Sequence, residues 1–121
     1  VRYKLIKSHV FAHHIDFLRT NWPESPVVLV HRPDDACLGW WVKCGQFDIT
    51  YPLYRTYYKN LRSMSKIISQ QNQDILKAWQ KYPGKEVVHN FELSWEIGLP
   101  RFSDEFRHDY PTNDIRVKVI K

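Results

Sequence analysis

The sequence VVLVHRPDD at residues 27–35 decides the fold that we expect for this chain. Its first four residues are an uninterrupted run of apolar, mostly β-branched side chains, which is typical of a parallel strand buried on both faces. Arg32 follows the end of that strand. Asp34 or Asp35 can cap the next helix, expected at residues 36–44, because a carboxylate there accepts hydrogen bonds from free backbone N–H groups. The stretch therefore predicts a strand, a corner and a helix.

Another strand and helix are expected before this stretch. Residues 1–6 form a short β-prone run, and apolar residues at helical spacing come next: Phe11, Ile15, Leu18 and Trp22. Pro23 ends that helix. A strand, a helix and a second strand in this order form a right-handed crossover in a parallel sheet. The fold class that we predict is mixed α/β, a three-layer sandwich around a central, mainly parallel sheet.

The later part of the chain predicts one long helix and two more strands. Residues 53–82 read as mostly helical, with an apolar stripe made of Met64, Ile67, Ile68, Ile75 and Trp79. Inside this helix, the polar run at residues 70–73 is expected to face water. Apolar and polar residues alternate at 91–95 and again at 115–119, as in strands with one wet face.

The length and the net charge of the chain limit the number of domains and the kinds of partner that we expect. The chain has 121 residues, which suits one domain with one core, so we predict a single α/β domain over residues 1–121. Because the chain opens directly on a β-prone run at Val1, it is expected to be a processed product or the later part of a longer protein. Eighteen Lys and Arg against thirteen Asp and Glu leave a formal charge of +5, which favours anionic partners.

No segment reaches the roughly 18 apolar residues that a membrane span requires, and no secretory signal is apparent. We therefore predict a cytoplasmic protein with no membrane partner. Cys37 and Cys44 lie seven residues apart, about two turns of a helix, and are expected to be buried thiols rather than a disulfide. The six scattered histidines show no spacing typical of a metal site, so no metal is predicted.

Two polar segments follow predicted strands, at the edge where open α/β sheets bind ligands. The first is Lys7-Ser8-His9 and the second begins at Arg32. Arg32 beside a helix N-terminus would make a cradle for a phosphate group. In the alternative interpretation Arg32 pairs with Asp34 or Asp35, and His9 is a turn histidine that bonds to the backbone.

The segment from Leu5 to Trp41 resembles the middle of the sulfotransferase fold, whose enzymes use 3′-phosphoadenosine 5′-phosphosulfate (PAPS). In that family a strand ends in Lys-Thr/Ser-His, a helix follows, and the next strand ends in an arginine that binds the 3′-phosphate. Lys7-Ser8-His9 and Arg32 match these features. The resemblance implies that His9 is the general base for a hydroxyl acceptor, that Lys7 lies near the sulfonate, and that Arg32 grips the 3′-phosphate.

The sequence also departs from the family pattern. Gly39 and Trp40 stand where the family has a serine that contacts the 3′-phosphate, and these two are the remaining cofactor-binding positions that the resemblance implies. The family's phosphosulfate loop has no counterpart, because the chain begins after it. The resemblance therefore implies either an active sulfotransferase with residues upstream or a non-catalytic relative that binds a nucleotide such as PAPS or adenosine 3′,5′-bisphosphate (PAP).

Nucleic-acid binding is the first alternative function. Cations recur at helical spacing with tyrosines interleaved, at Arg55, Lys59, Arg62 and Lys66. Such a stripe could follow phosphates, although most charged helix faces are simply solvated. A structural or interaction protein is the second alternative, for which an exposed Trp40-Trp41 pair would be the sign.

Overall fold

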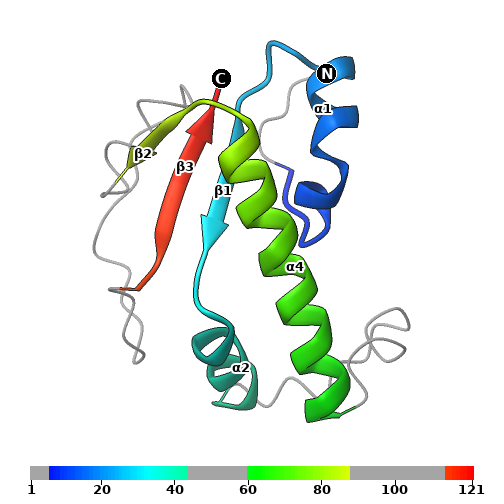
Figure 1. Ribbon diagram of the computed structural model, residues 1–121, viewed down its shortest axis with the longest axis vertical. Coiled ribbons are helices and arrows are strands. Elements are labelled where there is room, and N and C mark those ends of the chain that lie inside the picture. The colour runs from blue at the N-terminus through cyan, green and yellow to red at the C-terminus, as the bar shows by residue number, and fades with distance from the viewer. Residues whose placement is uncertain (1–5, 44–59, 88–113) are drawn as a thin grey trace.

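The computed structural model describes residues 6–43, 60–87 and 114–121. These residues form a 3₁₀-helix, three α-helices and three strands (Figure 1). In chain order they are η1 (Phe11–His14), α1 (Ile15–Asn21), β1 (Val27–His31), α2 (Asp34–Lys43), α4 (Leu61–Lys81), β2 (Lys85–Val87) and β3 (Arg116–Ile120). No helix within the described ranges is long and apolar enough to cross a membrane.

The three described strands form an antiparallel sheet in the order β1-β3-β2. Val27 of β1 lies opposite Ile120 of β3, and Lys85 of β2 lies opposite Val119. The mixed α/β class is confirmed, but a parallel three-layer sandwich is not supported. A branched apolar run specifies a strand without specifying its direction, and the described partner of β1 is the C-terminal strand, which runs the opposite way. The first predicted strand falls outside the described residues except for Ile6, which is not in a strand.

The core lies between one face of the sheet and the helices. Leu29 and Ile120 point from the sheet toward Ile15 of α1 and Ala78 of α4, and these four buried residues form one cluster. Figure 1 shows α1 and α4 beside each other along this face. Side chains alternate along a strand, so Val27 packs against the same cluster as Leu29, whereas Val28 and Val30 face the other way. Val30 there is 51% exposed, which shows that β1 is not buried on both faces as its sequence predicts.

The long helix α4 forms where the apolar stripe predicts it. Asn60 caps its N-terminus, because the Asn60 side chain accepts a hydrogen bond from the Ser63 N–H at 2.9 Å. Met64 and Ile68 are buried against α2 and form a second cluster. The helix ends at Lys81, two residues before Pro83. The part of the predicted helix at residues 53–59 lies outside the described residues.

The bounds of the remaining helices and strands differ from those expected from the sequence. The predicted first helix is split into η1 and α1, and it ends at Asn21, before Pro23. The helix α2 begins at Asp34, so both candidate caps lie within its first turn. A strand at residues 115–119 is confirmed by β3, but Val119 and Ile120 on its opposite faces are both buried, so one face is not wet throughout as expected. The short strand β2 was not predicted. The predicted strand at residues 91–95 lies outside the described residues.

Candidate functional site

The corner between β1 and α2 is held by an amide from α4. Asn72 Nδ2 donates to the backbone carbonyl of Arg32 at 2.8 Å and to Asp34 Oδ1 at 2.6 Å. Asn72 is 7% exposed, so the expectation that residues 70–73 all face water is wrong at this position. The side chain lies about 80° around the helix from Met64, at the edge of the apolar stripe, where a buried amide requires partners. The Asn72 amide finds these partners, the Arg32 carbonyl and the Asp34 carboxylate, at the corner.

Arg32 is anchored at its side chain as well as at its carbonyl. Its Nε donates to Asp114 Oδ1 at 2.9 Å, and the Arg32 side chain is 14% exposed. The two residues are 82 positions apart, so the sequence did not reveal this carboxylate as a partner. Asp35 accepts a hydrogen bond from the Ala36 N–H at 2.9 Å, as a residue of the first helical turn can. The corner thus joins β1, α2, α4 and the segment that enters β3.

Cys37 lies against the same corner. Its thiol donates to the Arg32 carbonyl at 3.4 Å. Burial raises the pKa of Cys37, so the sulfur is protonated and a poor nucleophile near neutral pH. Cys37 is a free cysteine, as expected, but it is half-buried rather than fully buried. Cys44 lies outside the described residues.

His31, the last residue of β1, is half-buried beside the corner. Burial and then the positive charge of Arg116 lower the pKa of His31, while Asp34 acts in the opposite direction. The imidazole is therefore neutral near pH 7. Because the His31 ring is neutral, it adds no positive charge to that of Arg32, the next residue along the chain.

The Lys7–His9 segment is an exposed loop that leads into η1. The Ser8 hydroxyl accepts a hydrogen bond from the Val10 N–H at 3.2 Å, so the turn is closed by Ser8. Partial shielding of the ring, and then the charge of Lys7, lower the pKa of His9. The imidazole is thus neutral near pH 7, although the residue as a whole is exposed.

The Arg32 corner and η1, which follows the Lys7–His9 loop, contact α4 on different sides. Asn72 meets the Arg32 corner, whereas Asp74 meets His13 of η1, with 3.5 Å between Asp74 Oδ2 and His13 Nδ1. Residues two positions apart on a helix are separated by about 200° around its axis. The contacts of the described residues therefore place the Arg32 corner and the helix that follows the Lys7–His9 loop on different sides of α4.

Gly39 and Trp40 lie in the middle of α2, and both are half-buried. Trp41 packs against the Met64 and Ile68 cluster. Trp40 and Trp41 are both half-buried, so the described residues give no exposed Trp40-Trp41 patch. Arg62 and Lys66 are exposed on α4, as the alternative nucleic-acid interpretation requires, while Arg55 and Lys59 lie outside the described residues.

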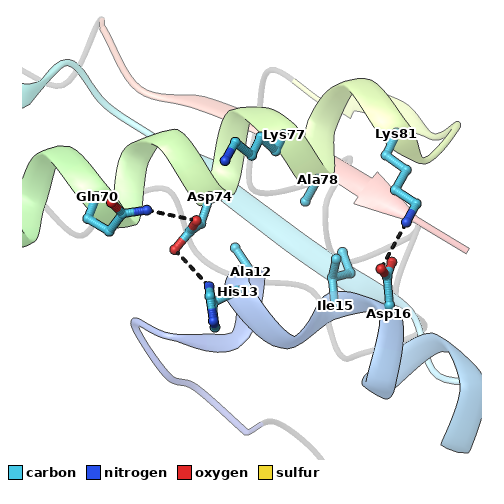
Figure 2. A pocket seen from close by; sticks show the side chains of 9 residues that line it. All are labelled: Ala12, His13, Ile15, Asp16, Gln70, Asp74, Lys77, Ala78 and Lys81. Atoms are coloured by element: carbon cyan, nitrogen blue, oxygen red, sulfur yellow. Dashed lines mark hydrogen bonds and ion pairs between the residues drawn. The ribbon is translucent and has the colours of Figure 1, made fainter.

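A shallow groove of about 340 Å³ separates η1 and α1 from α4 (Figure 2). Two acidic residues line it, and both are engaged. Asp74 accepts from Gln70 Nε2 at 3.1 Å, and Asp16 pairs with Lys81 at 2.8 Å and accepts a hydrogen bond from the Tyr82 hydroxyl. The two Asp16 contacts join residues 65 and 66 positions apart, so no local pattern in the sequence indicates them. Their arrangement attaches α1 to the end of α4.

Within the described ranges, no group of three His, Cys, Asp or Glu side chains is placed to hold a metal ion. Comparison of the whole chain with protein-family models, with curated proteins and with solved structures gives no match. The corner between β1 and α2 is therefore the candidate site. Its distinguishing feature is an arginine held at two points between a strand and a helix.

Proposed function

We propose that the chain is a sulfotransferase-like protein that binds a 3′-phosphoadenosine nucleotide, PAPS or PAP, at the corner between β1 and α2. The way Arg32 is held carries the proposal: Asn72 holds its carbonyl at 2.8 Å, and Asp114 holds its Nε at 2.9 Å. A guanidinium oriented in advance is a good donor to a phosphate, because less side-chain entropy is lost on binding. The N-terminus of α2 adds partial positive charge two residues later.

The carboxylates at the corner accept hydrogen bonds from neutral donors, which orient them but leave their negative charge, so the guanidinium must outweigh their repulsion of a phosphate. Asp34 accepts from Asn72, and Asp35 accepts from the backbone of Ala36. Asp114 binds the guanidinium itself, so a phosphate would compete with it or share it. Removal of the Asp114 charge is therefore expected to strengthen phosphate binding, even though it removes an ion pair.

The chemistry that the resemblance implies is in-line sulfonate transfer. The acceptor hydroxyl oxygen forms a bond to the sulfur of PAPS, the bond from sulfur to the 5′-phosphate oxygen breaks, and PAP leaves. The acceptor proton goes to His9, whose lowered pKa keeps the imidazole neutral and able to accept it near pH 7. Lys7 would balance the negative charge on the sulfonate oxygens. The resemblance supports the roles of His9 and Lys7, while the corner contacts support the role of Arg32.

Calorimetric titration with PAP tests the binding step. Wild type should bind PAP one to one and bind adenosine 5′-monophosphate, which lacks the 3′-phosphate, at least tenfold more weakly. Arg32→Gln should lose tenfold or more of the PAP affinity, because a charged hydrogen bond is typically worth about 1.5–3 kcal/mol. Asp114→Asn is the control that separates the ion pair of Arg32 from its contact with the phosphate. This variant breaks the same ion pair but leaves the guanidinium in place. Equal PAP affinity in wild type and Arg32→Gln would contradict the proposal.

Sulfonation of a simple phenol, 4-nitrophenol, from PAPS tests the transfer step. His9→Ala should keep PAP affinity within about twofold and abolish transfer, because the base is removed and the phosphate contact is not. His14→Ala is the matched control, since His14 is also exposed and lies in η1. Transfer at the wild-type rate in His9→Ala would exclude His9 as the base. PAP binding without transfer in wild type would leave the nucleotide-binding relative as the function.

A further inference from the structure

The solvent-facing side of α4 carries a row of cations with amide side chains between them. We call it the α4 ridge and define it by Arg62, Lys66, Gln73 and Lys77, all of which are exposed. At about 100° per residue, the last three lie roughly 40°, 20° and 60° around the helix from Arg62. Met64 is buried about 200° away from Arg62. The centre of the ridge is therefore on the side of α4 opposite Met64.

The cations of the ridge are not balanced by acids nearby. Among the described residues, Arg62, Lys66 and Lys77 form no ion pair with a carboxylate within 4.0 Å. Asp74 is the one acidic residue in the α4 sequence, and it is turned toward His13 and Gln70 in the groove. Within the part of the chain that the structure describes, the ridge thus carries three cations without a paired carboxylate, of which Lys77 also lines the groove that contains Asp16 and Asp74.

From this arrangement we propose that the α4 ridge binds the phosphate backbone of a nucleic-acid duplex without reading its sequence. Arg62 and Lys77 lie 15 residues apart, roughly 22 Å along the helix axis, which is enough to reach several successive phosphates. A helix of about 10–12 Å diameter also matches a major groove about 12 Å wide.

A membrane surface is a poorer partner for the same charges. A helix that binds a bilayer inserts its apolar face below the headgroups. The apolar face of α4 is occupied, because Met64 and Ile68 pack against α2 and Ala78 packs against Ile15. The ridge therefore offers charge without a free apolar face, which suits a soluble polyanion.

Fluorescence anisotropy with a labelled 20-base-pair DNA duplex tests the proposal, with affinity measured from 25 to 150 mM KCl. Three phosphate contacts predict a slope of about −3 for the logarithm of the binding constant against the logarithm of salt concentration. The double variant Arg62→Gln/Lys66→Gln should reduce that slope by about 2 in magnitude. Lys85→Gln/Lys121→Gln is the matched control, since it removes the same net charge elsewhere and should leave the slope unchanged.

Three outcomes would overturn the proposal. One is that wild type does not bind the duplex at 25 mM KCl. Another is that both double variants weaken binding equally, which would assign it to net charge alone. The last is competition by PAP. Saturating PAP should leave the duplex affinity unchanged, so displacement of the duplex by PAP would mean that the duplex binds at the Arg32 corner. Because the ridge and the corner are tested by different variants, either proposal can fail while the other stands.

Discussion

Asn72 stabilises the corner through two hydrogen bonds from one buried amide. Asn72→Leu would keep the number and branching of the side-chain heavy atoms and leave the Arg32 carbonyl and Asp34 carboxylate without this donor. We expect the free energy of unfolding to fall by about 1–3 kcal/mol, the usual cost of an unsatisfied buried polar group. Urea denaturation measures this change. Gln73→Leu, at the exposed neighbouring position, should change stability by less than about 0.5 kcal/mol, so an equal loss in both variants would contradict the assigned role.

Cys37 gives a chemical readout of the same corner. Because burial raises its pKa and its thiol donates to the Arg32 carbonyl, alkylation by iodoacetamide at pH 7.5 should be slow. We expect the rate in a Cys44→Ser background to be at least tenfold lower in the folded protein than in urea, measured by mass spectrometry. Asn72→Leu should accelerate the reaction if it loosens the corner. Rapid alkylation of the folded wild type would show that the thiol is accessible.

At the scale of secondary-structure elements, α1 depends on α4 for its position. Asp16 joins them through Lys81 and Tyr82, and Ile15 packs on Ala78 beside this pair. The element is short, with seven residues, and helices of that length are unstable alone in water. Its order therefore depends on these tertiary contacts.

Loss of the Asp16 charge should release α1. We predict that Asp16→Asn accelerates amide hydrogen exchange in residues 15–22 severalfold while exchange in the middle of α4 stays unchanged, as measured by mass spectrometry. Glu24→Gln, an exposed carboxylate beyond α1, is the control and should have no effect. Hydrogen bonds from Lys81 and Tyr82 lower the pKa of Asp16, so its contribution is present above about pH 3.8 and is lost as the pH falls through the folded-state value. Unchanged exchange in Asp16→Asn would mean that packing alone holds α1.

The molecule as a whole should become less stable below pH 6.5. Burial lowers the pKa of both His9 and His31 from 6.5, so the unfolded chain binds protons that the folded chain does not. Stability then rises with pH up to about 6.5 and levels off above it. Urea titrations at pH 5.5 and 7.5 should give the lower free energy of unfolding at pH 5.5.

The variant His31→Gln isolates one source of that dependence. Removal of the His31 imidazole should reduce the difference between pH 5.5 and 7.5, because one of the two shifted groups is gone. His14→Gln is the control and should leave the difference as in wild type. A wild type that is more stable at pH 5.5 than at 7.5 would contradict the assigned direction.

The fold was predictable where a local pattern was sufficient. The apolar stripe of α4 located Met64 and Ile68 in the core, and the branched runs located β1 and β3. The direction of pairing was not predictable, since a run of valines can join a parallel or an antiparallel partner. Asn72 was assigned to water because its neighbours are glutamines, although its position at the edge of the apolar stripe was the available signal.

The sequence by itself determined that this is a basic α/β protein with one long amphipathic helix, and it singled out Arg32 by its place between a strand and a helix. Those features depend on residues within a few turns of each other. Only the tertiary structure decided that β1 pairs antiparallel with β3, that Arg32 meets Asp114, and that Asn72 holds the corner. Each of these joins residues at least 40 positions apart, where local periodicity carries no information and burial, hydrogen bonding and charge select the partners.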